Sequence, residues 1–154
     1  MLTCSMADRD LIYRTLWQGA RPETGPELAR SGFSAVVLCE DDYQPNSEEF
    51  PGVSVWRCPF SDTYDRMPSN DRMVSIRDAA RKVSVLVRRG DKVLVACFAG
   101  LNRSGLVTAL ALHKLTGWSG EQIVDHIQAR REHALDNPVF ARFVKQLPAR
   151  RGRL

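Results

Sequence analysis

The chain has 154 residues, of which 44% are hydrophobic and 26% are charged, and its formal net charge is +4. These values are ordinary for a soluble globular protein, and we expect a single domain over residues 1–154, with a core at about 11–147 and a basic tail at 148–154. No apolar run reaches the roughly 18 residues of a membrane span, and charges come too early for a secretion signal. We therefore expect a cytoplasmic monomer with no membrane partner. Its modest positive charge favours anionic partners such as phosphates and is too small to indicate nucleic acid.

The first half of the chain alternates short apolar runs with segments rich in turn residues. β-Branched and aromatic residues at alternating or continuous positions predict strands, and Gly, Pro, Asn and Ser clusters predict the connections between them. On this basis we expect strands at 11–17, 33–39 and 53–58, a short helix within 22–32 and an acidic loop at 40–52.

The second half is mostly helical in pattern. Apolar residues recur at helical spacing before Gly90 and before Gly117, and Ser119 and Asn137 suit the first position of two further helices. We expect helices at about 70–89, 104–117, 119–132 and 137–147, with a continuous apolar strand at 91–96. Strands interleaved with helices predict a single α/β domain with a central, partly parallel sheet flanked by helices and a helical C-terminal half.

The four cysteines, at positions 4, 39, 58 and 97, form no Cys-x-x-Cys pair. They are too sparse for a disulfide scaffold, and the three histidines lie in helix-like segments with no spacing that suits zinc. We therefore expect no metal. Cys97 alone stands between an apolar strand and a helix.

Cys97 opens the segment "CFAGLNRSG" at the carboxyl end of the apolar strand, where α/β domains bind their ligands. The helix after it begins near Ser104, so unpaired backbone amides and the positive end of the helix dipole face the loop. Gly100 eases the curling of these amides around an anion, and Arg103 can bind two phosphate oxygens with its planar fork. These groups favour the thiolate of Cys97 and predict phosphoryl transfer through a phosphocysteine. A Cys-x5-Arg spacing also arises by chance, and a buried thiol at the end of a strand is the alternative.

The segment "VACFAGLNRSG" resembles the signature loop of the cysteine-dependent protein tyrosine phosphatases, especially their compact dual-specificity branch. The resemblance covers most of residues 11–147, and the loop is its specific part. The other similar segments, in order and spacing, are "LWQG", "GFSAVVLC", "VWRCPFSD" and "GWSGEQIVDHIQARREHALDNPVFARFVKQL".

The resemblance implies roles for the residues of this loop. Cys97 would be the nucleophile, Arg103 the clamp on the phosphate, and Ser104 the group that helps the Cys97 sulfur to leave, although Ser104 also suits a simple N-cap. The backbone amides that would line the phosphate belong to Phe98, Ala99, Gly100, Leu101, Asn102 and Arg103.

The family also needs a carboxyl group as general acid and base, on a loop after an earlier strand. Asp62 follows Pro59 in the family's pattern and is the candidate, Asp65 is the alternative, and Asp71 suits a helix start. The chain departs from the family at Ala96, where the family usually has a His that shapes the loop. We expect an active enzyme with a less strongly activated cysteine.

The resemblance implies a phosphatase that acts on phosphomonoesters without a cofactor or metal. Since none of the variable loop residues is basic, inositol lipids with many phosphates are disfavoured. Protein phosphotyrosine is the leading substrate, with phosphoserine and phosphothreonine left open. "GLNRSG" also resembles the loop of RNA 5′-triphosphatases, which generally manage without the Asp. Two further classes stay open, a rhodanese-like sulfurtransferase and a catalytically weak phosphate-binding module.

Overall fold

The structure, a computed structural model, describes residues 7–150. Cys4 and the last four residues of the basic tail lie outside the described residues. The core of the fold is a five-stranded mixed sheet with the strand order β1-β2-β5-β3-β4. Its strands are β1 (Arg9–Tyr13), β2 (Leu16–Gly19), β3 (Ala35–Glu40), β4 (Ser54–Phe60) and β5 (Val93–Ala96).

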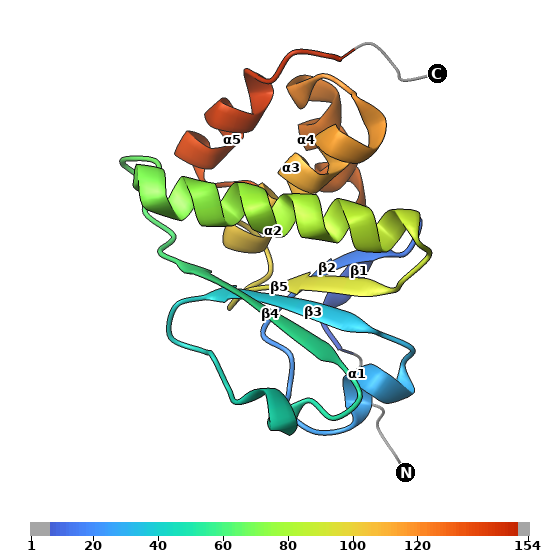
Figure 1. The fold of residues 1–154 in the computed structure, drawn as a ribbon. Coiled ribbons are helices and arrows are strands. Elements are labelled where there is room, and N and C mark those ends of the chain that lie inside the picture. The colour runs from blue at the N-terminus through green and yellow to red at the C-terminus, as the bar shows by residue number, and fades with distance from the viewer. Residues whose placement is uncertain (1–6, 151–154) are drawn as a thin grey trace.

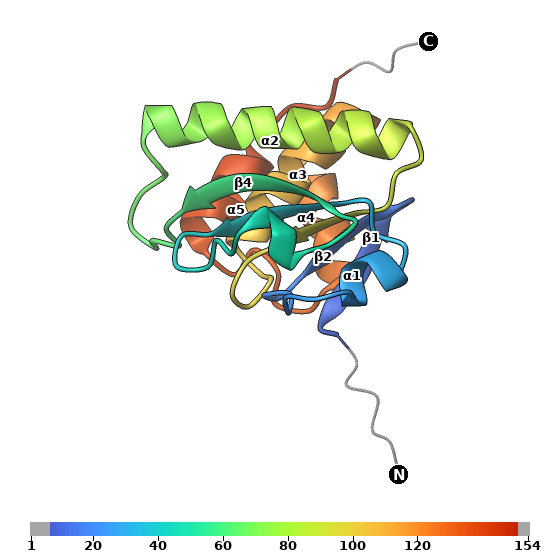
Figure 2. The same ribbon diagram turned by 60° about the horizontal axis from the view of Figure 1, so that its bottom comes forward.

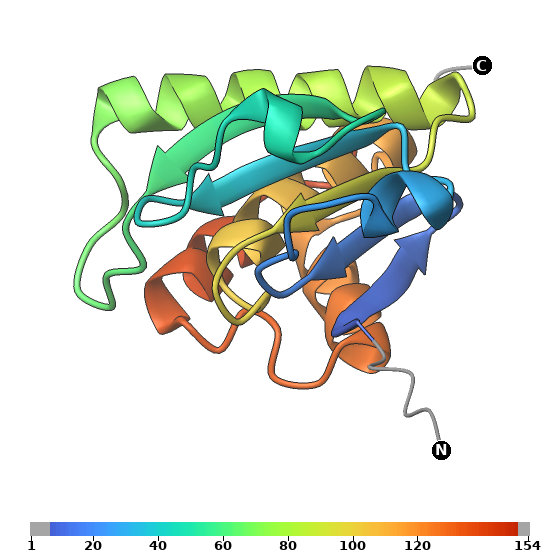
Figure 3. The same ribbon diagram turned by 90° about the horizontal axis from the view of Figure 1, so that it is seen from below.

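Four of the five strands are parallel and only β1 runs in the opposite direction. β5 lies in the middle, between β2 and β3, and all four of its residues are buried. A continuous apolar run is the pattern expected of a strand that is covered on both faces. The carboxyl ends of the parallel strands therefore meet at one edge of the sheet (Figure 3).

Helices cover both faces of the sheet, but unequally (Figures 1 and 2). The longest helix, α2, lies with α3, α4 and α5 on one face, and the short α1 and the 3-10 helix η1 lie on the other (Figure 1). The elements are α1 (Glu27–Arg30), η1 (Ser47–Glu49), α2 (Asn70–Arg88), α3 (Arg103–Thr116), α4 (Gly120–Arg130) and α5 (Pro138–Lys145).

Each face of the sheet has its own apolar core. The larger core packs the inner faces of α2 to α5 against the sheet, and α3 is buried along almost its whole first three turns. The smaller core lies under α1 and includes Leu28, Leu38, Leu94 and Ala96. Because β5 and α3 are both buried, the loop that joins them is anchored at both ends.

The predicted fold class, a single α/β domain with a partly parallel sheet and a helical C-terminal half, is confirmed. The caps predicted for the last two helices are also confirmed. The Ser119 side chain accepts from the backbone of Gln122, and the Asn137 side chain accepts from Val139 and Phe140. No helix in the described range 7–150 is long and apolar enough to cross a membrane.

The single strand predicted at 11–17 is wrong. The segment forms two antiparallel strands, β1 and β2, with a tight turn at Arg14 and Thr15. Arg14 has a positive φ of 52°, a conformation that a non-glycine residue seldom adopts. The turn has no Gly, Pro, Asn or Asp to mark it. The pattern of apolar residues therefore continues across the turn and resembles that of one strand.

Candidate active site

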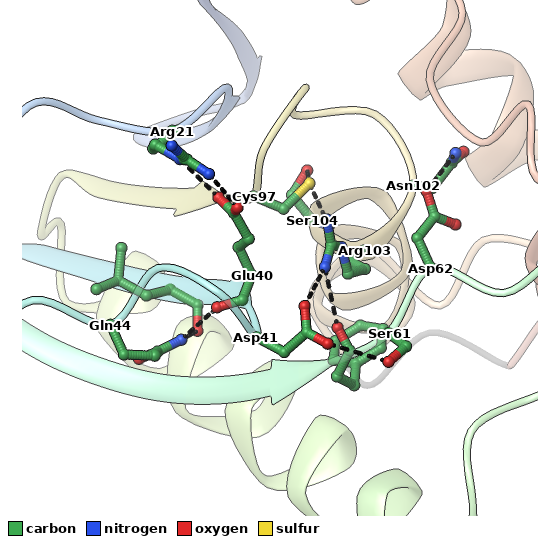
Figure 4. A network of polar contacts seen from close by, with 12 residues as sticks. Arg21, Glu40, Asp41, Gln44, Ser61, Asp62, Cys97, Asn102, Arg103 and Ser104 are labelled. Atoms are coloured by element: carbon green, nitrogen blue, oxygen red, sulfur yellow. Dashed lines mark hydrogen bonds and ion pairs between the residues drawn. The ribbon is translucent and has the colours of Figure 1, made fainter.

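The edge where the parallel strands end carries four connections that form the candidate site. Arg21 follows β2, Asp41 follows β3, Asp62 follows β4 and Cys97 follows β5. These residues are far apart in the sequence, and the parallel topology brings them together, as α/β sheets do with their ligand-binding loops. Figure 4 shows their polar contacts.

The loop from Cys97 to Asn102 turns tightly between β5 and α3. At its middle, Gly100 has a φ of +72°, and a Cβ there would lie 2.2 Å from the backbone carbon of Gly19. Only glycine permits this close approach of two backbones, so the loop is held against the end of β2. The predicted role of Gly100 in the curl of the loop fits this geometry.

Cys97 is 4% exposed and directly follows β5. Its Sγ is 3.3 Å from the hydroxyl of Ser104 and accepts a hydrogen bond from the backbone N–H of Ser104 at 3.4 Å (Figure 4). Both contacts join the sulfur to the first turn of α3. Ser104 is not a cap, since α3 begins one residue earlier and Asn102 holds the N-cap position.

The other described cysteines, Cys39 and Cys58, differ from Cys97 in their surroundings. Burial in the apolar core raises the pKa of the Cys58 thiol to about 11 and raises the pKa of Cys39 as well. Both stay neutral near pH 7, because burial disfavours the charged form. Among the described cysteines, Cys97 alone contacts the amide end of a helix.

Arg103 points its guanidinium into the site and is anchored from one side. Its Nη1 donates to Asp41 Oδ1 at 2.8 Å and to the Phe60 carbonyl at 3.2 Å (Figure 4). Its Nε is buried and has no hydrogen-bond partner among residues 7–150. A buried donor without a partner is unfavourable, whereas a phosphate oxygen would satisfy it. Asp41 thus orients Arg103 and leaves a donor for an anion.

Asp62 lies beside the loop, and each of its oxygens is held by an asparagine. Asn102 Nδ2 donates to Oδ2 at 3.0 Å, and Asn137 Nδ2 donates to Oδ1 at 2.7 Å. The backbone N–H of Asn137 donates to Asn102 Oδ1 at 2.9 Å, which joins the three side chains into one network. The Tyr64 hydroxyl accepts from Asn102 Nδ2 at 3.1 Å and lies in the same group.

The two other aspartates considered as general acids lie elsewhere. Asp65 is exposed, and Asp71 lies in the first turn of α2, where its charge suits the helix dipole as predicted. The sequence favoured Asp62 over Asp65, and Asp62 is the one in contact with the loop.

Three site contacts were missed from the sequence. Asn137 was seen only as a helix cap, Asn102 only as a backbone amide, and Asp41 only as part of an acidic loop. The position of Asp41 directly after a buried strand was the one available signal, because that edge of the sheet gathers ligand-binding groups.

Ala96, where the resemblance has a histidine, is 1% exposed and packs in the smaller apolar core. A methyl group cannot donate or accept a hydrogen bond. Polar support for the loop must therefore come from other residues.

The site suits an anion better than a metal. Within residues 7–150, no group of three or more His, Cys, Asp or Glu side chains is placed to hold a metal ion. The loop instead combines a thiol, the amide end of a helix and an arginine with a free donor. This set can bind a tetrahedral oxyanion and attack its central atom.

Comparisons with known proteins agree with this geometry. The family described as "Dual specificity phosphatase, catalytic domain" matches residues 16–149. The human protein tyrosine phosphatase type IVA 3 is 29% identical over 128 residues, which cover 82% of this chain and 72% of that protein. The fission yeast (Schizosaccharomyces pombe) tyrosine-protein phosphatase yvh1 is 37% identical over 65 residues, 42% of this chain but 19% of that longer protein.

Solved structures share the fold over nearly the whole chain. Human DUSP28 superposes with a TM-score of 0.73 at 22% identity and covers 94% of this chain and 95% of its own. A mouse putative dual specificity phosphatase, solved in complex with zinc tungstate, gives 0.75 at 22% identity, with coverages of 95% and 91%. The family match covers far more than half of the sequence. The chain belongs to the dual specificity phosphatase family, within the superfamily of cysteine-dependent protein tyrosine phosphatases.

Proposed function

We propose that the chain hydrolyses phosphomonoesters through a phosphocysteine on Cys97, most effectively protein phosphotyrosine. The observation that carries the proposal is the presence of three groups around one loop. The Cys97 sulfur accepts from the amide end of α3, and Arg103 Nε is a buried donor with no partner among the described residues. Asp62 is fixed beside them by two asparagines.

In the first step, the Cys97 thiolate attacks phosphorus, the S–P bond forms and the ester P–O bond breaks. Asp62 gives its proton to the leaving oxygen, while Arg103 and the amides of the loop stabilise the charge on the phosphoryl oxygens. In the second step, Asp62 takes a proton from water, whose oxygen bonds to phosphorus as the S–P bond breaks. Ser104 then donates to the sulfur that leaves.

The rim of the site favours an aromatic ester. Phe98 is 60% exposed and Tyr64 is 55% exposed, and both belong to the loops that carry Cys97 and Asp62. Ala99 is exposed and Leu101 is half-buried. These side chains can pack against the ring of phosphotyrosine, whereas a phosphoserine presents no such surface.

Basic groups at the rim are few, which disfavours substrates with several phosphates. Arg21 lies next to Phe98, with its guanidinium 5.1 Å from the ring centre. It forms a two-point ion pair with the buried carboxylate of Glu40, which neutralises its charge. The physiological substrate we propose is thus a phosphorylated protein.

We expect kcat/KM for a phosphotyrosyl peptide to exceed that for the same peptide with phosphoserine by about tenfold or more, since ring packing of this kind amounts to roughly 1 kcal/mol per aromatic contact. Release of inorganic phosphate in the presence of EDTA measures kcat/KM for both peptides. Phe98→Ala should reduce the ratio of the two kcat/KM values. Equal rates on the two peptides would overturn the substrate assignment while leaving the phosphatase proposal intact.

Replacing Asp62 by asparagine is expected to lower kcat for the phosphotyrosyl peptide by roughly 100-fold, because a positioned general acid contributes about that factor or more. Asp65→Asn is the matched control and should stay near wild type. An unchanged rate in Asp62→Asn would favour an RNA 5′-triphosphatase, tested by γ-phosphate release from triphosphate-ended RNA. Binding of phosphotyrosine without any turnover by wild type would favour a phosphate-binding module.

A further inference from the structure

The back of the Cys97 loop is held by groups from distant parts of the chain. Every backbone carbonyl from residue 98 to residue 101 accepts a hydrogen bond from a donor outside the loop. Phe98 accepts from the Arg21 N–H at 3.1 Å, Ala99 from Arg131 Nη2 at 3.0 Å, Gly100 from Arg131 Nε at 2.6 Å and Leu101 from the Leu135 N–H at 3.0 Å.

These bonds fix the direction of the loop amides. In a trans peptide the C=O and the following N–H point in opposite directions, and no cis peptide bond occurs in the described chain. A carbonyl drawn outward therefore turns the next N–H inward, toward the anion. Arg131 draws out the carbonyls of Ala99 and Gly100, so it orients the N–H groups of Gly100 and Leu101.

Arg131 is suited to this task by its own surroundings. It follows α4, its side chain is 4% exposed, and all three of its nitrogens have partners. Nε and Nη2 bind the loop, while Nη1 binds Asp8 at 3.0 Å and Asp10 at 2.9 Å. A planar guanidinium can reach two carbonyls and a carboxylate pair at once, which an ammonium cannot.

We propose that Arg131 is a positioning residue for oxyanion binding. It holds the amides of Gly100 and Leu101 toward the phosphate and polarises their peptide groups through charged hydrogen bonds to the carbonyls. Gln18, which is fully buried, supports the same loop by donating to the Gly100 carbonyl at 3.0 Å. The inference rests on the proposed function, since it assumes that the loop binds an oxyanion.

Arg131 also gives the loop the polar support that Ala96 cannot give. The residue before the cysteine lies in an apolar core, and the loop is instead organised from the opposite side by a cation. The carboxylates of Asp8 and Asp10 balance the charge of Arg131, so the guanidinium can be buried.

The test is the dissociation constant of tungstate, a phosphate analogue, measured by titration calorimetry on wild type, Arg131→Lys and Arg131→Met. We expect Arg131→Met to bind tungstate roughly tenfold or more weakly, because hydrogen bonds from a charged group are lost. Arg131→Lys keeps the positive charge, but its ammonium group cannot reach both carbonyls at once. This variant should bind tungstate about threefold more weakly than wild type. Arg130→Met is the matched control, since Arg130 is exposed and bonds only within α4 among the described residues. It should bind like wild type.

Circular dichroism at the same temperature shows which variants are folded. If Arg131→Met does not fold, Arg131→Lys decides the question. A folded Arg131→Lys or Arg131→Met that binds tungstate as tightly as wild type would overturn the inference. A wild-type protein that binds no tungstate would instead overturn the proposed function, so the two failures are distinguishable.

Discussion

The variant Cys97→Ser is expected to lower kcat on p-nitrophenyl phosphate by a factor on the order of 10⁴ or more, because it removes the nucleophile that we propose for the covalent step. A serine hydroxyl is a far weaker nucleophile than a cysteine thiolate. Phosphate release with EDTA present measures the effect.

Binding should survive in Cys97→Ser. The amides and Arg103 remain, so tungstate should still bind within a few-fold of its wild-type affinity. Cys58→Ser is the matched control. It alters another buried thiol, one that burial keeps neutral, and should reduce thermal stability while leaving turnover near wild type. Persistent turnover in Cys97→Ser would rule out the phosphocysteine.

Arg103→Lys is expected to reduce kcat/KM by roughly 10²–10³-fold, the usual loss when one donor to a developing oxyanion is removed. Lysine keeps the positive charge, but it cannot hold Asp41 on one side and offer a second donor to phosphate on the other. Steady-state kinetics on p-nitrophenyl phosphate measure the loss.

The matched control for that change is Arg57→Lys, because Arg57 is exposed and bonds to Gln44, Pro45 and Ser47 away from the loop. It should retain wild-type kinetics. An Arg103→Lys variant as active as wild type would mean that charge alone suffices and that the fork geometry of Arg103 has no role.

The secondary structure could be predicted from the sequence wherever burial produces a periodic pattern of apolar residues. The continuous apolar run of β5 and the helical spacing of α2 each follow from the surfaces they bury, so both were predicted within a few residues. The β1–β2 turn could not be predicted. Arg14 has a positive φ there, but neither turn residue is of a type that usually marks a turn.

For the site, too, contacts between residues close in the sequence could be predicted and contacts between distant residues could not. Cys97, Arg103 and Ser104 lie within one short segment, and a strand–loop–helix pattern predicts the contact between Cys97 and Ser104. Asn137 and Arg131 act on this loop from more than thirty positions along the chain, through packing of the C-terminal helices. No local pattern encodes such pairings, so the contacts that hold the loop and Asp62 required the structure.

The mass of the peptide that contains Cys97, measured after a brief reaction, tests directly whether a phosphocysteine forms. Ser104→Ala is mixed with a phosphotyrosyl peptide and denatured rapidly in alkali, since loss of the donor to the leaving sulfur should slow hydrolysis of the intermediate without slowing its formation. We expect a Cys97 peptide heavier by one phosphoryl group, and no such species in Cys97→Ser. Phosphate release that proceeds with Cys97 unmodified at every time point would contradict the phosphocysteine mechanism.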